Sequence, residues 1–434
     1  MKMSGWGRYP QIETEVVYPA SFSDCSQRIR SADRVIARGL GRSYGDSSLY
    51  QNMLGSRYLD RYVAFDEESG LLTCSAGVSL DQIVSTFVPR GWFLPVTPGT
   101  RFVTIGGAIA SDVHGKNHHV DGTFCDHVDR IDLLLGSGEV VTVTPDEKPD
   151  LFRATCGGMG LTGMILSASL KLRRIKSGEM EQTIIKTPDI EATLRAFEEA
   201  SGASYSVAWI DCLARGKALG RSLLVLGEHA QKGSLNAKPG QGISIPCNMP
   251  SGLLNPLTVK LFNALYYNKV LHSGKKSIVS LHSFFYPLDS LQNWNRLYGR
   301  KGFVQYQFVL PKSSGLEGIK HMLERISHSG RGSFLAVLKV FGSANDNLLS
   351  FPMEGYTLAL DFKVEPAVFS LLDELDRIML DHGGRLYLTK DSRMSEETFK
   401  AGYPAWADFN EIRTRYQAID KFVSGQSIRL GLNS

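Results

Sequence analysis

The chain has 434 residues, of which 43% are hydrophobic and 21% are charged, and its formal net charge at pH 7 is +4. This composition is that of a globular protein of two or three domains, so it excludes a disordered chain, a collagen and a long coiled coil. The charge is too small to argue for nucleic-acid binding, and no apolar run reaches the roughly 20 residues of a membrane span. The N-terminus lacks the apolar stretch of a secretory signal and the six cysteines form no C-x-x-C pair, so we expect a cytoplasmic protein with reduced thiols.

Over residues 1–176, short β-rich runs alternate with glycine-rich turns. Apolar runs bounded by glycine predict strands, and a serine directly before an apolar periodic segment predicts a helix start. The expected elements are strands at 35–37 and 71–78, a helix capped by Ser79, a hairpin of 131–135 with 140–143, and a closing strand at 163–172.

The pattern changes near residue 177, where longer helical periodicities are mixed with strands. Apolar residues three and four apart predict a helix over Gly315–Ser329, and Asp189 is the expected N-cap of another helix. The remaining expected elements are that helix at 190–199 and strands at 304–310 and 334–341.

Residues 229–256 form a long segment rich in glycine, proline, serine and asparagine. A loop of that length is usually functional or disordered. The apolar and aromatic stretch Leu253–Leu271 overlaps its end. Two interpretations stay open for this stretch: a helix packed on the core, or a flap that lies on a membrane surface.

Three glycine-rich elements lie within the first 165 residues, at 38–45, 98–111 and 157–163. Glycine lets the backbone approach a phosphate and present its N–H groups to the anion. Each element alone is more typical of a tight turn, but three together favour a bound dinucleotide. The chain has no P-loop and no G-x-S-x-G elbow, and its G-x-G-x-x-G at 158–163 leads into a strand instead of a helix, which argues against an NAD site of the Rossmann type.

A polar cluster, D-V-H-G-K-N-H-H at 112–119, contains three histidines. His118 and His119 are adjacent, which is poor geometry for a single ion, and no cysteine or E-x-x-H motif accompanies them. We therefore expect no metal. A structural role and contact with a cofactor or substrate both stay open.

In this order, R-G-x-G-x-S at 38–43, P-G-T at 98–100 with T-I-G-G-A-I-A at 104–110, and G-x-G-L-T-G at 158–163 resemble the vanillyl-alcohol-oxidase/PCMH class of FAD oxidoreductases. Within that class, residues 37–46, 98–119 and Y-L-T-K-D-S-R at 387–393 are similar to the decaprenylphosphoryl-β-D-ribose 2-oxidase family, the flavoprotein subunits of an arabinan-precursor epimerase. Further similar segments lie at 294–296, 305–308 and 333–342, so the resemblance extends over almost the whole chain.

The resemblance implies an α+β fold with a PCMH-type FAD-binding domain of two α/β subdomains at 1–176. It implies a substrate (cap) domain with an antiparallel sheet at 177–384, and a return of the chain to the FAD-binding domain at 385–434. Many relatives carry a histidine that bonds covalently to the flavin. Arg42 stands at that position here, so we expect non-covalent FAD.

The resemblance also implies two sets of site residues. The set that would contact FAD is Ala37, Arg38, Gly39, Leu40, Gly41, Arg42, Ser43, Tyr44, Gly45, Asp46, Ser47, Gly99, Thr100, Thr104, Ile105, Gly106, Gly107, Ser111, Asp112, Val113, His114, Ile165 and Tyr387. The set that would face the substrate is Tyr44, His114, Lys116, Gln305, Gln307, Lys339 and Lys390.

The implied reaction is oxidation of a polyprenyl-phosphoryl pentose at its 2-hydroxyl by hydride transfer to flavin N5, which yields a 2-keto sugar. A free lysine has a pKa near ~10.4, so it needs burial to act as a base, whereas histidine titrates nearer neutrality. We therefore favour His114 as base or proton relay, and Lys390 as an electrostatic and hydrogen-bonding group. Lys390 as a solvated lysine at a strand end is the alternative.

Two residues depart from the family pattern in the segment 356–362. Ala359 stands where the mycobacterial enzyme has an inhibitor-reactive cysteine, so thiol-directed covalent inhibitors are expected to fail, and Thr357 replaces an asparagine. These changes leave the identity of the sugar and of the polyprenyl chain open.

The expected partners are a lipid-linked sugar as substrate, a separate NADH-dependent short-chain reductase and a quinone acceptor. The expected location is the cytoplasm, with peripheral contact to the inner membrane, whereas analogy with the family suggests the periplasm. Two other functions stay open: a sugar or alditol oxidase that uses O₂, and a flavin-free carbohydrate-binding protein.

Overall fold

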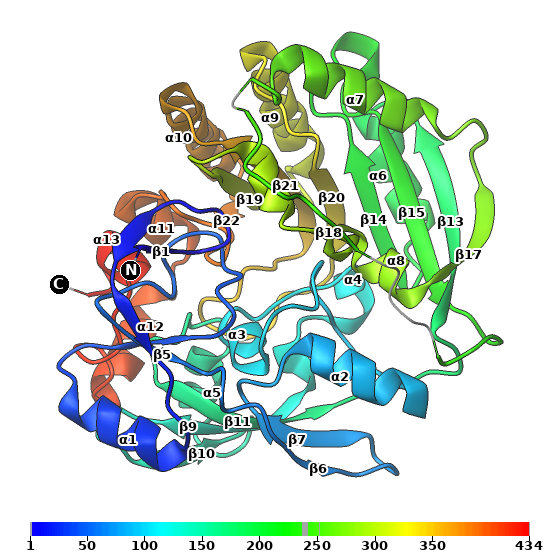
Figure 1. Ribbon diagram of the computed structural model, residues 1–434. Coiled ribbons are helices and arrows are strands. Elements are labelled where there is room, and N and C mark those ends of the chain that lie inside the picture. The colour runs from blue at the N-terminus through cyan, green and yellow to red at the C-terminus, as the bar shows by residue number, and fades with distance from the viewer. Residues whose placement is uncertain (1, 237–241, 251, 434) are drawn as a thin grey trace.

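The computed structural model describes residues 2–236, 242–250 and 252–433. It has two lobes, one built from the N-terminal and C-terminal parts of the chain and one from its middle (Figure 1). Each lobe combines sheets with helices, which confirms the expected α+β class. Among the described residues no helix is both long and apolar enough to cross a bilayer.

The first lobe contains two main sheets. The three-stranded sheet is parallel, in the order β3 (Glu15–Val17), β5 (Asn52–Gly55), β4 (Ile36–Arg38). The five-stranded sheet is antiparallel, in the order β10 (Val140–Val143), β9 (Val128–Leu134), β11 (Met164–Lys171), β7 (Leu71–Ser75), β6 (Tyr62–Phe65). The pairing of β9 with β10 confirms the expected hairpin.

The helices of this lobe are α1 (Phe22–Ser31), α2 (Leu80–Phe87), α3 (Ile105–Ala110), α4 (His118–Asp121) and α5 (Pro149–Thr155). Ser79 caps α2 as expected, and it forms a reciprocal capping box with Gln82. The strand expected to reach residue 78 ends at Ser75, because after one more bond to β11, from Ala76 N–H to Leu166, the chain turns away and Gly77 N–H bonds to Leu59.

The second lobe is built on one antiparallel sheet of eight strands. Their order is β17 (Lys275–Ser280), β13 (Glu179–Thr187), β15 (Ser222–His229), β14 (Tyr205–Ile210), β20 (Ala336–Phe341), β21 (Gly355–Lys363), β19 (Phe303–Pro311), β22 (Arg385–Leu386). The strand expected at 334–341 begins at Ala336, because Ser333 holds a local turn in which its hydroxyl accepts from Leu335 N–H. Short strands β1 (Lys2–Ser4) with β2 (Gln11–Glu13), β8 (Trp92–Phe93) with β12 (Arg173–Arg174), and β16 (Ile243–Ser244) with β18 (Leu291–Gln292) complete the sheets.

The two faces of the large sheet carry different helices. Leu310 and Tyr356 are register partners, and α9 (Gly315–Ser329) packs on them so closely that a Cβ added at Gly315 or Gly318 would clash. With α9, helices α6 (Ile190–Glu199) and α10 (Pro366–Asp381) cover that face. The expected ranges of α6 and α9 are confirmed, and Asp189 caps α6.

The opposite face carries the odd-numbered residues of β19, because side chains alternate along a strand. Register places Gln307 beside Ala359, Ala359 beside Val337, and Val337 beside Trp209 on this face. Helix α7 (Pro256–Asn268) packs here, with Tyr266 4.7 Å from Trp209 between ring centres (Figure 1).

The helical interpretation of Leu253–Leu271 is therefore confirmed for residues 256–268, although α7 buries only Val259 and Asn263. In the long segment 229–256 that leads to it, residues 237–241 and 251 lie outside the described residues, and among those that are described β16 is the one strand that lies wholly within it.

After β22 the chain returns to the first lobe. Val35 N–H bonds to Lys421, and α12 (Trp406–Arg415) packs on α5. The helices that complete the chain are α8 (Leu281–Phe285), which precedes β19, and α11 (Glu396–Gly402), α12 (Trp406–Arg415) and α13 (Gly425–Arg429). Arg385 and Leu386 still belong to the large sheet, and the three-part division of the chain stays a prediction.

Candidate active site

The first two glycine-rich elements lie against each other at the junction of the lobes. A Cβ added at Gly39 would stand 2.5 Å from Thr104 Oγ1, and one at Gly45 would clash with the backbone of Asp391. The loop after β4, the start of α3 and the loop after β22 therefore meet at one place. Only glycine permits so close an approach of backbone to backbone.

This junction fits a bound anion. Among the described residues, the N–H groups of residues 39–43 donate to no backbone carbonyl. Thr104 caps α3 by accepting from Gly107 N–H at 3.1 Å, and a Cβ at Gly99 would meet nothing within 4 Å. Free backbone donors beside open space are what the pyrophosphate of a dinucleotide requires.

The residues expected to contact FAD all lie on these elements or beside them. Residues 37–47 lie at the end of β4 and in the loop that follows, Gly99 and Thr100 in the turn before α3, Thr104–Gly107 at its start, Ser111–His114 after its end, Ile165 on β11, and Tyr387 after β22. Several of their side chains already bind protein atoms, so they can offer only backbone to a cofactor. Arg38 donates to the Ser4 carbonyl at 2.7 Å, Asp46 pairs with Arg429 at 2.8 Å, and Asp112 accepts from Ser350 at 2.7 Å.

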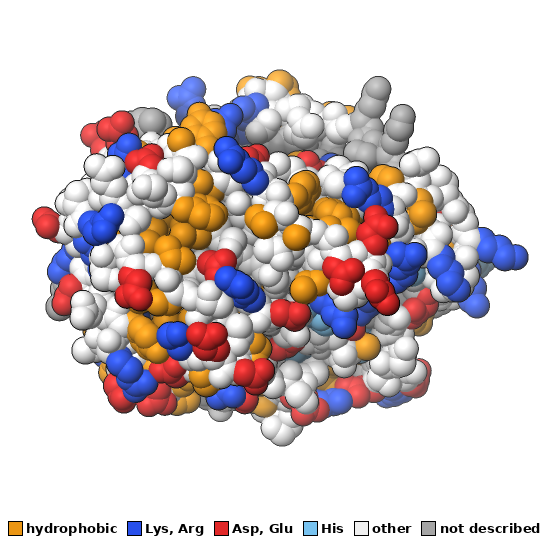
Figure 2. Space-filling model, turned by 90° about the horizontal axis from the view of Figure 1, so that it is seen from below, with side chains coloured by type: hydrophobic (Ala, Val, Ile, Leu, Met, Phe, Trp, Pro, Cys, Tyr) orange, Lys and Arg blue, Asp and Glu red, His pale blue; other side chains and the backbone are white. Residues whose placement is uncertain are grey.

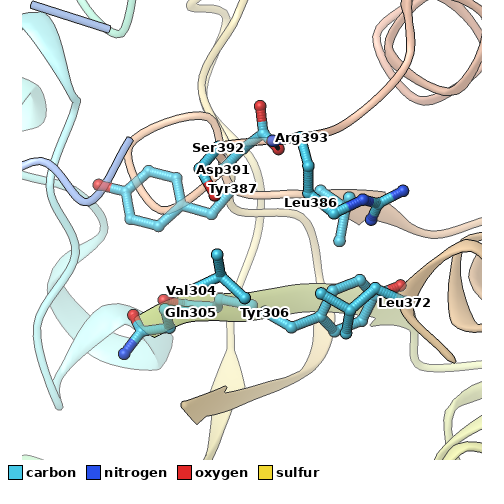
Figure 3. Close-up of a pocket in the computed structure, with 10 residues that line it drawn as sticks. Val304, Gln305, Tyr306, Leu372, Leu386, Tyr387, Asp391, Ser392 and Arg393 are labelled. Carbon is cyan, nitrogen blue, oxygen red and sulfur yellow. Dashed lines mark hydrogen bonds between the residues drawn. The ribbon is translucent and has the colours of Figure 1, made fainter. Parts of the chain in front are cut away.

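The cap sheet faces these loops with polar side chains. Gln307 Nε2 lies 3.1 Å from His114 Nε2 and 3.3 Å from Thr357 Oγ1. Tyr387 donates to the Ser111 carbonyl at 3.0 Å. Figure 3 shows Gln305 and Tyr387 projecting to the same side, towards the ribbon of the first lobe, while Tyr306 and Arg393 lie on the other side.

His114 is buried between aromatic rings. Its ring centre lies 4.7 Å from that of Phe341 and 5.0 Å from that of Tyr387. Burial, followed by the charge of Lys339, holds its pKa well below the ordinary value, so the ring is neutral at pH 7. With Nε2 as the acceptor from Gln307, the imidazole proton is on Nδ1, which has no partner among the described residues.

Three half-buried lysines lie in this part of the site. Burial lowers the pKa of Lys390 to about 8, and that of Lys116 and Lys339 to about 7. Lys390 Nζ lies 4.1 Å from the centre of the Tyr44 ring, Lys339 Nζ lies 3.5 Å from the Gly115 carbonyl, and Lys116 Nζ donates to the Phe284 carbonyl. The site thus concentrates positive charge in a desolvated environment, where an unpaired charge destabilises the folded protein.

One carboxyl group faces this cluster, and we did not expect it from the sequence. Asp361, on β21, accepts from Gln305 Nε2 at 2.6 Å, and the same Nε2 lies 3.2 Å from Tyr44 Oη. Burial raises the pKa of Asp361 to about 7, and the hydrogen bond from Gln305 and the charge of Lys390 oppose the rise. The sequence signal that could have identified Asp361 is an aspartate at an inward-facing position of the apolar strand T-L-A-L-D-F.

The other histidines of the 112–119 cluster bind backbone. His118 Nδ1 accepts from Gly342 N–H at 3.2 Å, and His119 Nε2 donates to the Ala203 carbonyl at 2.8 Å. The part of the chain that the structure describes contains no group of three or more His, Cys, Asp or Glu placed to hold a metal ion. Of the three histidines, the structure places His114 at the candidate site.

Comparison with known proteins agrees with this geometry. Residues 14–144 match the model of an FAD binding domain. The chain is 38% identical to the decaprenylphosphoryl-β-D-ribose oxidase of Mycolicibacterium smegmatis, over 99% of this chain and 97% of the other. It is 20% identical to the L-gulono-1,4-lactone dehydrogenase of Mycobacterium tuberculosis, over 98% of each chain.

The full-length similarity, the matched FAD binding domain and the junction of glycine-rich loops lead to one conclusion about family and cofactor. The chain belongs to the PCMH-type FAD-binding oxidoreductases and is an FAD-dependent oxidoreductase.

Proposed function

We propose that this enzyme oxidises the 2-hydroxyl of a polyprenyl-phosphoryl pentose, such as decaprenylphosphoryl-β-D-ribose, to a 2-keto sugar. The observation that carries the proposal is the cluster of half-buried lysines Lys116, Lys339 and Lys390, which the carboxyl of Asp361 faces. A phosphodiester anion would compensate this charge, whereas a neutral sugar or lactone would not. The similarity to the mycobacterial decaprenylphosphoryl-β-D-ribose oxidase supports the same substrate class.

FAD, held non-covalently by the loop after β4 and the start of α3, would supply the hydride acceptor. Many relatives have a histidine that bonds to the flavin at the position of Arg42. The arginine side chain offers no such nucleophile, and its guanidinium lies 4.1 Å from the centre of the Trp6 ring. Tyr387 and the loop after α3 would line one side of the flavin site. Gln307, Gln305 and Thr357 would orient the sugar hydroxyls through their amide and hydroxyl groups.

Lys390 is the group that we propose as acceptor of the hydroxyl proton. The preference for His114 depended on the high pKa of a free lysine, and burial removes that objection because the pKa of Lys390 falls to about 8. His114 would instead present its Nδ1–H as a donor to a substrate oxygen.

A pH profile distinguishes the two candidate bases. If Lys390 is the base, kcat/KM of the holoenzyme with the pentose substrate rises with pH through an apparent pKa near 8. The K390M variant should then lack this rise, which is the acid limb of the profile. If His114 is the base, the profile is already flat above pH 6.5, and H114Q loses most activity at every pH. A flat profile in the wild type together with an active K390M variant would contradict our assignment.

Anaerobic titration of the flavin absorbance tests the function itself. We expect polyprenyl-phosphoryl ribose to bleach the oxidised flavin band and free ribose to leave it unchanged. The similarity to L-gulono-1,4-lactone dehydrogenase favours a second candidate, oxidation of a soluble sugar or lactone. Bleaching by L-gulono-1,4-lactone but not by the lipid-linked sugar would establish that alternative and overturn the first proposal.

We further propose that the 2-keto product passes to a separate NADH-dependent short-chain reductase, which completes an epimerisation for polysaccharide-precursor synthesis. A quinone is the proposed acceptor of the electrons. Measuring reoxidation of the reduced enzyme with a soluble quinone and with O₂, with peroxide as the second readout, separates this acceptor from an oxidase reaction.

A further inference from the structure

Helix α7 exposes a stripe of leucines on the surface of the cap lobe. Leu257, Leu261 and Leu265 are 75%, 59% and 65% exposed, and their spacing of four residues puts them on one side of the helix. Leu271 continues the apolar surface beyond the end of the helix and is 82% exposed. Single exposed leucines are ordinary, but a continuous stripe marks an interaction surface.

The chain around α7 is strongly biased in charge. From His229 to Leu288 it contains six lysines and no aspartate, glutamate or arginine. Lys260 on α7, Lys269 directly after its last residue, and Lys275 and Lys276 on β17 are all exposed. Exposed leucines bordered by lysines are complementary to a bilayer with anionic headgroups, since the leucines enter the interface and the lysines contact phosphate.

The opposite surface of the molecule differs. Figure 2, seen from below Figure 1, shows apolar side chains interspersed with basic and acidic groups. Val63 on β6 and Val140 on β10 belong to the five-stranded sheet of the first lobe and are 65% and 49% exposed. These two residues provide a control for exposed apolar character without the surrounding excess of lysine.

Beneath its exposed stripe, α7 contacts the face of the sheet that carries the candidate active site. Phe262 lies 5.7 Å from Phe334 between ring centres, and Asn263 donates to Asp211 at 2.9 Å. A cavity of about 210 Å³ opens beside the first turn of α7, between Val259 and Phe334, and Asp361 forms part of its wall. The surface with the leucine stripe therefore lies next to a cavity that reaches Asp361, the acceptor of the Gln305 hydrogen bond.

We propose that α7 is the membrane-docking helix of this enzyme, with Leu257, Leu261 and Leu265 inserted into the interface of an anionic bilayer. The lysines of α7 and β17 contact the headgroups, and the lipid-linked substrate enters the cap from the side of α7. This inference deepens the proposed function and rests on it for the lipid nature of the substrate, but the docking itself does not require it.

Vesicle binding of the full-length holoenzyme tests the docking. Sedimentation with phosphatidylcholine vesicles that contain phosphatidylglycerol is compared with sedimentation with phosphatidylcholine alone. We expect binding to the anionic vesicles only, weakened by 0.5 M salt, and reduced about tenfold or more in the variant L257S/L261S/L265S. The variant K260Q/K269Q/K275Q/K276Q should lose the preference for anionic lipid, and V63S/V140S should bind as the wild type does.

Three outcomes would overturn the proposal. The first is equal vesicle binding by the leucine variant and the wild type, with flavin absorbance and Tm showing that both are folded. The second is no vesicle binding by the wild type. The third is a dimer, found by light scattering, that the leucine variant abolishes, since a second copy would then cover the stripe.

The readouts separate this inference from the proposed function. With a short-chain prenyl-phosphoryl pentose in solution, the leucine variant should keep the wild-type kcat/KM, whereas with polyprenyl substrate in vesicles its rate should fall. If the wild type binds vesicles but polyprenyl-phosphoryl ribose leaves its flavin oxidised, the proposed function fails and the docking stands.

Discussion

At the scale of single residues, Asp361 controls how easily Lys390 gives up its proton. Its negative charge raises the pKa of Lys390 against the effect of burial. D361N removes this charge, so the pKa of Lys390 should fall below about 8 and the acid limb of the kcat/KM profile should move to lower pH by about one unit. D361E, which restores the charge, should return the limb towards its wild-type position. A limb that stays in place in D361N would show that Asp361 acts only in folding.

Ala359 provides a second prediction at this scale. It pairs with Gln307 in the register of β19 and β21, so its side chain projects from the face that carries the candidate site. Five of the cysteines are buried and Cys247 is exposed, so C247S is a suitable background for labelling. In that background we expect a thiol-directed inhibitor to leave the enzyme active, and A359C to be inactivated with time and protected by substrate. Inactivation of C247S alone would contradict this expectation.

At the scale of elements, local signals predicted the helices that begin at a polar cap. Asp189 and Ser79 cap α6 and α2, and the apolar period of α9 gives its full range. The sequence could not predict the long-range register that brings β19 and β21 to the loop after α3, because period-2 alternation identifies a face but not its partner. For the same reason Asp361 stayed unassigned, although the glycine-rich loops were identified by motif.

The cap of α2 carries a prediction of its own. Ser79 Oγ accepts from Gln82 N–H at 3.2 Å, and Ser79 N–H donates to Gln82 Oε1 at 2.8 Å. S79A removes one of these bonds and should lower the free energy of unfolding by about 1 kcal/mol. Urea unfolding of the holoenzyme measures this, with S23A at an exposed position of α1 as the control. Equal losses in both variants would show that the cap does not stabilise the lobe.

At the scale of the whole molecule, the half-buried lysines of the candidate site link the stability of the fold to pH. Lys339 has a pKa of about 7 in the folded protein and an ordinary value of 10.5 when unfolded. Between these values the unfolded chain binds more protons, so this group makes the folded state more stable as pH rises from 7 to about 10. The same sign holds for Lys116 and Lys390. The fold thus tolerates a charge cluster that a bound phosphate would compensate.

Replacing one of these lysines should therefore stabilise the protein while it weakens substrate binding. K339M removes this charge, so the free energy of unfolding of the holoenzyme should rise by on the order of 2 kcal/mol at pH 7 and below, and the gain should vanish towards pH 10. K232M, at an exposed lysine, should leave both the Tm and its pH dependence unchanged.

Binding of a short-chain prenyl-phosphoryl pentose to the wild type at pH 7.5 should take up protons, because the anion raises the lysine pKa values. Calorimetry in buffers of different ionisation enthalpy measures that uptake, and proton release instead would contradict a phosphate site at the lysine cluster.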